Sequence, residues 1–185
     1  TTLFSTDDTK KNEDFSEKTI AELVRACFEM GKVKTGALIV IERGTPLGEI
    51  ERTGIEVDGI VTSQLLINIF EHNTPLHDGA VVIRGNRVTA ATCYLPLSDN
   101  MDISKALGTR HRAAVGVSEA TDSVTLVVSE ETGRVSVAVS GRLKSVKDGD
   151  ELRDMLSVLV KRETENTGRF RIWKGRRRNE RKADE

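Results

Sequence analysis

Three short segments of this sequence carry charged and polar residues that packing does not explain. The first is His77-Asp78-Gly79-Ala80, directly before an apolar run. An aspartate can serve as a general base or a metal ligand, and a glycine lets a backbone N–H approach a phosphate. Asp-Gly is also an ordinary turn dipeptide. The segment alone therefore leaves a catalytic turn and a plain turn as alternatives.

The second segment is Gly108-Thr109-Arg110-His111-Arg112. Two arginines flank a histidine, and planar guanidinium groups suit bidentate binding of phosphate oxygens. Thr109 is a candidate cap for a helix that begins here, and the N–H groups of such a helix start bind anions. A solvated basic turn is the alternative interpretation.

The third segment, Ser129-Glu130-Glu131, follows a predicted strand. Acids at a strand end can hold Mg²⁺ or Mn²⁺ together with substrate phosphates, although an acidic hairpin tip is the simpler interpretation. All three segments lie at loops or strand ends, where functional sites concentrate. Together they favour chemistry on nucleotide phosphates.

Several function classes are excluded. The chain has no G-x-x-x-x-G-K-[ST] motif, no G-x-G-x-x-G after a strand and no kinase signature set. Lys and Arg total 28 against 29 Asp and Glu, and the resulting net charge of −1 argues against a globally basic nucleic-acid-binding domain. No apolar run is long enough to span a membrane.

Cys27 and Cys93 form no disulfide framework, and we expect two buried, inert thiols.

Hydrophobic periodicity predicts the elements that must position these segments. We expect a helix with an Asp14/Glu17 capping box and a stop at Gly31, and a last helix capped near Asp148 and Asp150. A middle helix capped by Ser63 and another helix around residues 113–117 complete the set of helices. Strands are expected at 37–41 and 54–61, with two hairpins at 80–94 and 124–140. The fold class is α/β: a single domain with a central mixed β-sheet of about six or seven strands flanked by helices.

Asp78-Gly79-Ala80 and Arg110-His111-Arg112 resemble the DGA and RHR motifs of diadenylate cyclases, in particular the CdaA-type enzymes. The similarity extends from about residue 16 to 159 and includes Thr74-Pro75-Leu76-His77 and Ala106-Leu107-Gly108-Thr109. The two motifs in this order, about thirty residues apart, make it specific. It implies a DAC-domain fold and condensation of two ATP molecules into cyclic di-AMP and two pyrophosphates. It also implies a divalent metal, Mn²⁺ or Mg²⁺, with Co²⁺ as a further candidate.

The resemblance also implies roles for individual residues. Asp78 assists deprotonation of the ribose 3′-hydroxyl, and His77 and Glu131 correspond to metal contacts. Leu95 contacts the adenine with Tyr94 beside it. The implied ATP-binding residues are Gly79, Ala80, Tyr94, Leu95, Thr109, Arg110, His111, Arg112, Ser129 and Glu130.

The family works as two subunits face to face, so a homodimer or higher oligomer is expected. The resemblance further implies a membrane-linked regulator and a phosphoglucosamine mutase as partners, and no nucleic acid. We expect a polar leader at 1–13, the cyclase domain at 14–165 and a basic tail at 166–185. The tail is either solvated or attracted to anionic lipid headgroups. The chain is expected to be the soluble, cytoplasmic domain of a membrane-anchored bacterial protein.

Two other functions compete with the enzyme. One is a non-catalytic nucleotide-binding or sensor module of the same fold, which the loss of Asp78 would have favoured. The other is a protein that binds membrane or nucleic acid through its basic tail, which the near-neutral body of the chain disfavours. The presence of Asp78 favours the cyclase.

Overall fold

The computed structural model describes residues 15–105 and 107–159. The elements in chain order are α1 (Glu17–Lys32), β1 (Ala37–Ile41), α2 (Gly48–Glu51), β2 (Ile55–Ile60), α3 (Ser63–Phe70), β3 (Ala80–Arg84), β4 (Arg87–Cys93), α4 (Thr109–Ala120), β5 (Val124–Val128), β6 (Val135–Val139) and β7 (Arg142–Ser145). A further helix covers residues 149–159. The predicted leader (1–13) and basic tail (166–185) lie outside the described residues. No helix in the described part is long and apolar enough to cross a bilayer.

The strands form one seven-stranded sheet in the order β2-β4-β3-β1-β5-β6-β7. β1 and β3 are parallel, and every other neighbouring pair is antiparallel. The predicted mixed sheet and both predicted hairpins, β3–β4 and β5–β6, are confirmed. Two elements, α2 and β7, were not predicted, because each has four residues and carries no apolar run.

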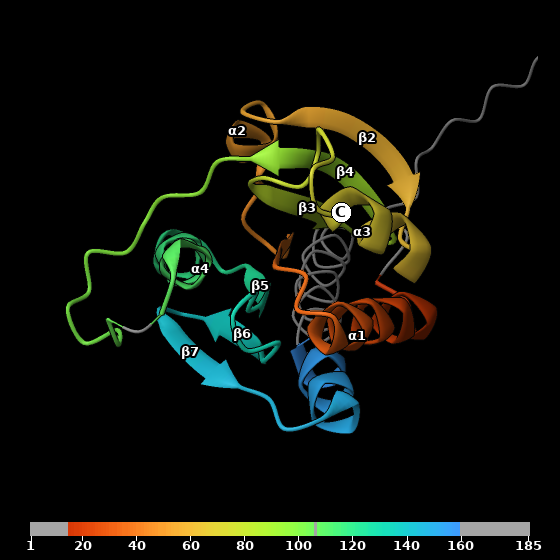
Figure 1. Ribbon diagram of the computed structural model, residues 1–185. Helices are drawn as coiled ribbons and strands as arrows, with labels where there is room; N and C mark the ends of the chain where they lie inside the picture. The colour runs from red at the N-terminus through yellow and green to blue at the C-terminus, as the bar shows by residue number, and fades with distance from the viewer. Residues whose placement is uncertain (1–14, 106, 160–185) are drawn as a thin grey trace, which may run out of the picture.

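Helices cover both faces of the sheet. In β1, Leu38 and Val40 pack with Ala114 of α4, whereas Ile39 and Ile41 belong to the core formed with α1, α3 and the last helix. Figure 1 shows β5 and β6 lying between α4 on one side and α1 on the other. Because both faces are buried, β1 reads as a continuous apolar run rather than an alternation. Both cysteines are buried, as predicted, and burial raises the pKa of the Cys27 thiol to about 12.

The predicted starts of three helices differ from the observed ones, two of them by one or two residues and the third by four. The N-cap of α1 is Ser16, whose Oγ accepts from the N–H of Thr19 at 3.2 Å, and Asp14 lies outside the described residues. The N-cap of α3 is Thr62, not Ser63. α4 begins at Thr109, earlier than the predicted centre of 113–117, and its N-cap is Gly108. Asp148 does cap the last helix, because its Oδ1 accepts from Glu151 N–H at 2.9 Å.

The end of α1 is a Schellman motif rather than a stop at Gly31. The N–H of Thr35 bonds to Met30 O at 2.9 Å, and the N–H of Lys34 bonds to Gly31 O at 3.2 Å. Lys34 occupies the left-handed position of the motif with φ 56°. The two bonds fix the direction in which the chain leaves α1 and enters β1.

The strand pairing brings four chain segments to one edge of the sheet. Ala37 at the start of β1 pairs with Val128 at the end of β5, and Ala80 at the start of β3 pairs with Cys93 at the end of β4. Since β1 and β3 are parallel, both of these strand starts lie at the same edge. The residues before β1 and β3 and those after β4 and β5 therefore meet there.

Gly116 holds the loop after β4 against α4. A Cβ at this position would lie 2.0 Å from Pro96 O, so an alanine must push the loop away. We predict that Gly116→Ala lowers the free energy of unfolding by about 1–3 kcal/mol, measured by urea denaturation. The control is Gly48→Ala, where no atom lies within 4 Å of the added carbon. Equal stability of the two variants would contradict the prediction.

Candidate functional site

The sheet edge described above opens into a cavity of about 510 Å³. His77 reaches it from the segment before β3, Gly36 from the segment before β1, and Arg110 from the first turn of α4. Glu130 reaches it from the segment after β5. The remaining lining residues are Val33, Lys34, Thr35, Phe70, Glu71 and His72.

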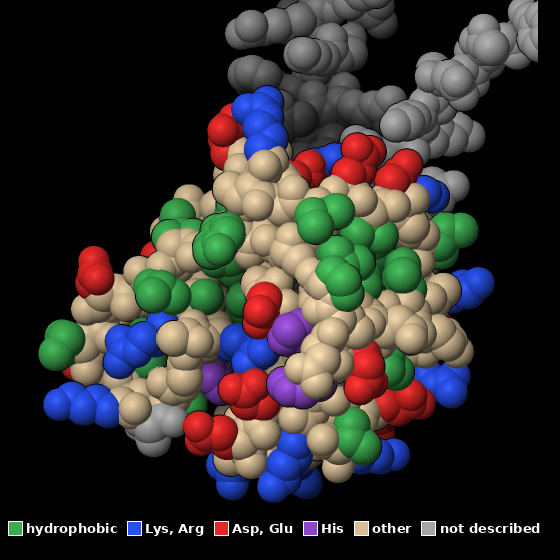
Figure 2. All heavy atoms as spheres, turned by 45° about the horizontal axis from the view of Figure 1, so that its top comes forward, with side chains coloured by type: hydrophobic (Ala, Val, Ile, Leu, Met, Phe, Trp, Pro, Cys, Tyr) green, Lys and Arg blue, Asp and Glu red, His purple; other side chains and the backbone are tan. Residues whose placement is uncertain are grey.

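A second cavity, of about 280 Å³, lies beside the first. Arg110 and Glu130 line both cavities, so this pair forms their common wall. The other lining residues of the second cavity are Leu107, Gly108, Thr109, His111, Val128, Ser129, Glu131, Thr132, Arg134, Ser136 and Ser145. All three segments singled out from the sequence therefore contribute to one hollow region. In Figure 2, histidine side chains gather on one face of the molecule among acidic and basic ones.

Arg110 is a half-buried cation that lines both cavities. Its Nη1 donates to Glu130 Oε2 at 2.8 Å, and its side chain is 24% exposed. The guanidinium also lies against the backbone of Gly36, where an added Cβ would stand 2.7 Å from both Cζ and Nη1. The position of this group is thus set by contacts from two different loops.

His111 is buried and lines the 280 Å³ cavity beside Arg110. Burial lowers the pKa of its imidazole, and the positive charge of Arg110 lowers it further against a smaller opposing effect of Glu131. The ring is therefore neutral at neutral pH. A neutral imidazole can donate through one nitrogen and accept through the other.

The segment before β3 is an exposed, well-ordered turn. His77 Nδ1–H donates to Thr74 O at 2.7 Å, and its Nε2 lies 3.4 Å from Asp78 Oδ1. The Asp78 side chain is 87% exposed and lies outside the lining of both cavities. Gly79 has φ +84°, and a Cβ there would stand 2.9 Å from Cys93 O. Glycine is thus required at this turn by conformation and by space.

The acidic hairpin tip is held by Ser129. Its Oγ accepts from the N–H of Glu131 at 3.3 Å and of Thr132 at 3.2 Å. The tip also rests on the end of α1, because a Cβ on Gly133 would stand 2.1 Å from Gly31 O. This close backbone contact places Glu130 opposite Gly36.

Some predicted site residues do not line either cavity in the described part of the chain. Tyr94 is 79% exposed, with its backbone N–H bonded to Thr53 Oγ1, and Leu95 packs on the core that includes α4. Ala80 is fully buried in the sheet. The carbonyl of Arg112 accepts from Ser98 N–H at 3.0 Å. Tyr94 and Ala80 nevertheless lie at the same sheet edge as the cavities, whereas Arg112 lies one turn into α4.

The sequence analysis missed several lining residues. Gly36, Lys34 and His72 belong to loops without a motif, and Arg134, Ser136 and Ser145 come from the β6 and β7 region. Only the strand order places these residues beside Arg110. A lone glycine or serine in a turn or strand carries no local signal for such a position.

The predicted metal contacts do not form a ready metal site. Among the residues that the structure describes, no group of three or more His, Cys, Asp or Glu could hold a metal ion. His77 lines the 510 Å³ cavity and Glu131 the 280 Å³ one. Such an arrangement fits a Mg²⁺-like ion that is held by one or two protein groups and takes its other ligands from substrate phosphates and water.

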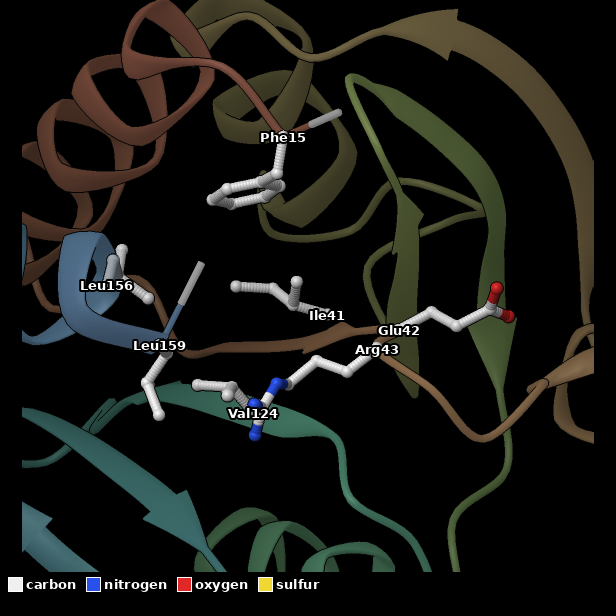
Figure 3. Close-up of a pocket in the computed structure, with 7 residues that line it drawn as sticks. All are labelled: Phe15, Ile41, Glu42, Arg43, Val124, Leu156 and Leu159. Carbon is white, nitrogen blue, oxygen red and sulfur yellow. The ribbon is translucent and has the colours of Figure 1, made fainter. Parts of the chain in front are cut away.

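A third hollow lies at the opposite edge of the sheet, where Ile41 pairs with Val124. Figure 3 shows Phe15, Leu156 and Leu159 around it, with Glu42 and Arg43 at its border. Its volume is about 20 Å³. It is too small for any part of a nucleotide, so the two polar cavities are the candidate site.

The chain is similar to several known proteins. The chain is 51% identical over 166 residues to the cyclic di-AMP synthase CdaA of Bacillus subtilis, covering 89% of this chain and 61% of that protein. It is 34% identical over 158 residues to a diadenylate cyclase of Mycoplasma pneumoniae, covering 84% of this chain and 76% of that one. The crystal structure of a double mutant of DacA from Staphylococcus aureus matches with a TM-score of 0.76 and 46% identity, over 78% of this chain and 96% of that one.

The chain spans 61% and 58% of the length of the first two curated relatives that it matches, from Bacillus subtilis and Listeria monocytogenes. A family model described as DAC, DisA bacterial checkpoint controller nucleotide-binding, matches residues 24–143. This range runs from the middle of α1 to β7 and contains both motifs and most of the lining of both cavities. The chain therefore belongs to the DAC family of nucleotide-binding domains, as its DGA and RHR motifs predict.

Proposed function

We propose that this chain is a diadenylate cyclase domain, which condenses two ATP molecules into cyclic di-AMP and two pyrophosphates. The observation that carries the proposal is the common wall formed by Arg110 and Glu130. Through this pair, the turn that contains His77 and Asp78 and the segment that contains Thr109 and His111 adjoin one hollow region. Relatives with up to 51% identity are named diadenylate cyclases or cyclic di-AMP synthases.

The reaction makes limited covalent demands on the protein. Each ribose 3′-hydroxyl loses its proton and its oxygen bonds to the α-phosphorus of the other ATP. The bond from that phosphorus to the bridging oxygen of the β-phosphate breaks, and pyrophosphate leaves with the electron pair. Such a transfer needs in-line positioning of the two nucleotides and stabilisation of charge on the phosphate oxygens.

The described residues can supply these needs. Arg110 offers a planar cation, and the N-terminus of the twelve-residue helix α4 adds the N–H groups of its first turn at Gly108 and Thr109. Gly79 lets the backbone approach the nucleotide. Asp78 acts as the base that accepts the proton of the 3′-hydroxyl. A divalent metal, with Mn²⁺, Mg²⁺ and Co²⁺ as candidates, would be held by His77, Asp78 or Glu131 and would neutralise phosphate charge.

We further propose that two subunits share each reaction. Asp78 is 87% exposed and is not among the residues that line the two cavities. An exposed base suits a hydroxyl brought by a nucleotide on a second subunit. A single chain carries one copy of each motif, whereas the product needs two reacting hydroxyl groups.

The direct test is to incubate the purified chain with ATP and, in turn, Mn²⁺, Mg²⁺ or Co²⁺. Separation of the products by chromatography and mass spectrometry should show cyclic di-AMP and pyrophosphate in a ratio of about one to two. ATP binding without product under any of the metals would favour the non-catalytic nucleotide-binding or sensor module instead.

The shared reaction predicts a dependence on protein concentration. We expect the rate per subunit to fall on dilution, because the two nucleotides meet only in an oligomer. Activity is measured over a dilution series, and sedimentation at the same concentrations reports the oligomeric state. Constant activity per subunit at concentrations where only monomer is present would contradict the two-subunit mechanism.

We also propose that the chain is the catalytic part of a longer, membrane-attached bacterial protein. A crystal structure described as a hypothetical membrane spanning protein from Bacillus cereus matches this chain with a TM-score of 0.68 and 42% identity, over 70% of this chain and 64% of that one. Binding of a membrane-linked regulator and of a phosphoglucosamine mutase stays a prediction. A pull-down of either protein with this chain would test it.

A further inference from the structure

Gly36 lies where a side chain would displace the main cation of the site. A Cβ built on Gly36 would stand 2.7 Å from both Cζ and Nη1 of Arg110 and 3.1 Å from Nη2. Real Cβ atoms do not approach other heavy atoms to 2.7 Å. The guanidinium therefore occupies the space that any other residue at this position would fill.

The backbone of Gly36 does not itself require glycine. Its φ lies outside the left-handed region, in contrast to Gly79 and Gly133. An alanine could adopt the same backbone conformation. The three atoms nearest to its Cβ would all belong to the Arg110 guanidinium. The reason for glycine at this position is thus the guanidinium, and not the turn.

Nη1, one of the two atoms nearest to this Cβ, also donates to Glu130 Oε2 at 2.8 Å. Arginine carries five N–H donors in a fixed fork, so fixing one of them on a carboxylate orients the others. Gly36 and Glu130 together limit where the guanidinium can lie, Gly36 by its missing side chain and Glu130 by its hydrogen bond, and we call this pair of residues the clamp.

The end of α1 positions both residues of this clamp, Gly36 and Glu130. The Schellman motif at Lys34 and Thr35 directs the chain into Gly36. The adjacent Gly31 contacts Gly133 through bare backbone and so locates the hairpin tip that carries Glu130. One helix end therefore sets the distance between the two groups that hold Arg110.

We propose that Gly36 is a positioning residue of the nucleotide site: its missing side chain lets the Arg110 guanidinium lie in the orientation that binds the nucleotide phosphates. This inference rests on the proposed function, because it assigns a phosphate to Arg110. It concerns a residue outside both motifs. Gly36 acts through Arg110 and does not itself contact the reacting atoms.

The test is Gly36→Ala, with Gly48→Ala as the matched control, since the latter places its methyl group in open space. We expect Gly36→Ala to lower kcat by about 10–100-fold, because a misplacement of about 1 Å can cost that much. The affinity for a non-reactive ATP analogue, measured by calorimetry, should fall as well. Gly48→Ala should retain the wild-type kcat and affinity.

A double-mutant cycle separates this role from a general effect on folding. Lysine is slimmer than arginine and lacks its fork, so the effect of Gly36→Ala should largely disappear in an Arg110→Lys background. Should Gly36→Ala lower the thermal midpoint, the double variant should restore it. Equal effects of Gly36→Ala in both backgrounds, or a kcat and an affinity like those of Gly48→Ala, would overturn the proposal.

The two proposals fail in different ways. A wild-type chain that makes no cyclic di-AMP would refute the cyclase function, while the binding of the ATP analogue would still test Gly36. An active wild-type chain whose Gly36→Ala variant is equally active and binds equally well would refute only the positioning role.

Discussion

Asp78→Asn is expected to remove nearly all cyclic di-AMP synthesis while leaving ATP binding and folding intact. Asparagine keeps the shape of the side chain but can neither accept the proton of the 3′-hydroxyl nor carry the negative charge. Loss of a general base typically costs about 10²–10⁴-fold in rate. The rate is measured as product formed per subunit at saturating ATP, and binding is measured with a non-reactive ATP analogue.

The structure gives the reason to expect normal folding in this variant. The Asp78 side chain is 87% exposed, and its recorded ionic contact is a 3.4 Å approach to His77 Nε2. Asp154→Asn is a suitable control, because Asp154 is exposed on the last helix, away from the site. An unfolded Asp78→Asn chain would make Asp78 structural, and a variant as active as Asp154→Asn would exclude Asp78 as the base.

The elements with strong periodicity were predictable from the sequence. α1 and the last helix show the apolar spacing of a helix packed on one face, and β1 is a continuous apolar run. Helix ends were harder, because neighbouring residues such as Thr62 and Ser63 are both good caps. β7 escaped prediction since an edge strand needs little apolar burial.

Some residues of the candidate site were also predictable from the sequence, and others were not. The motif residues Asp78, Gly79 and Arg110 could be singled out because their types and spacing suggest chemistry. Gly36 and Arg134 could not, since a sequence does not state that β1 pairs with both β3 and β5. That pairing alone brings the start of β1 beside the end of β5 and so places Gly36 next to Arg110 and Glu130.

From the contacts of the Arg110 guanidinium with Gly36 and Glu130, we expect the shape of this side chain to matter more than its charge. Arg110→Lys keeps a positive charge but loses the planar fork that can bind a carboxylate and a phosphate at once. We expect a loss of about 10²–10³-fold in kcat/KM for ATP, the effect of removing one donor that stabilises developing charge. The exposed Glu130 makes the ion pair worth at most about 1 kcal/mol, so stability should change little.

Arg25→Lys is the matched control, because Arg25 pairs with Glu29 on the exposed face of α1 and lines neither cavity. Steady-state kinetics and urea denaturation of both variants separate an effect on catalysis from one on folding. Near wild-type kcat/KM in Arg110→Lys would mean that a point charge suffices at this position. The clamp formed by Gly36 and Glu130 would then have no catalytic purpose, since its geometry serves only a side chain with a fixed, planar set of donors.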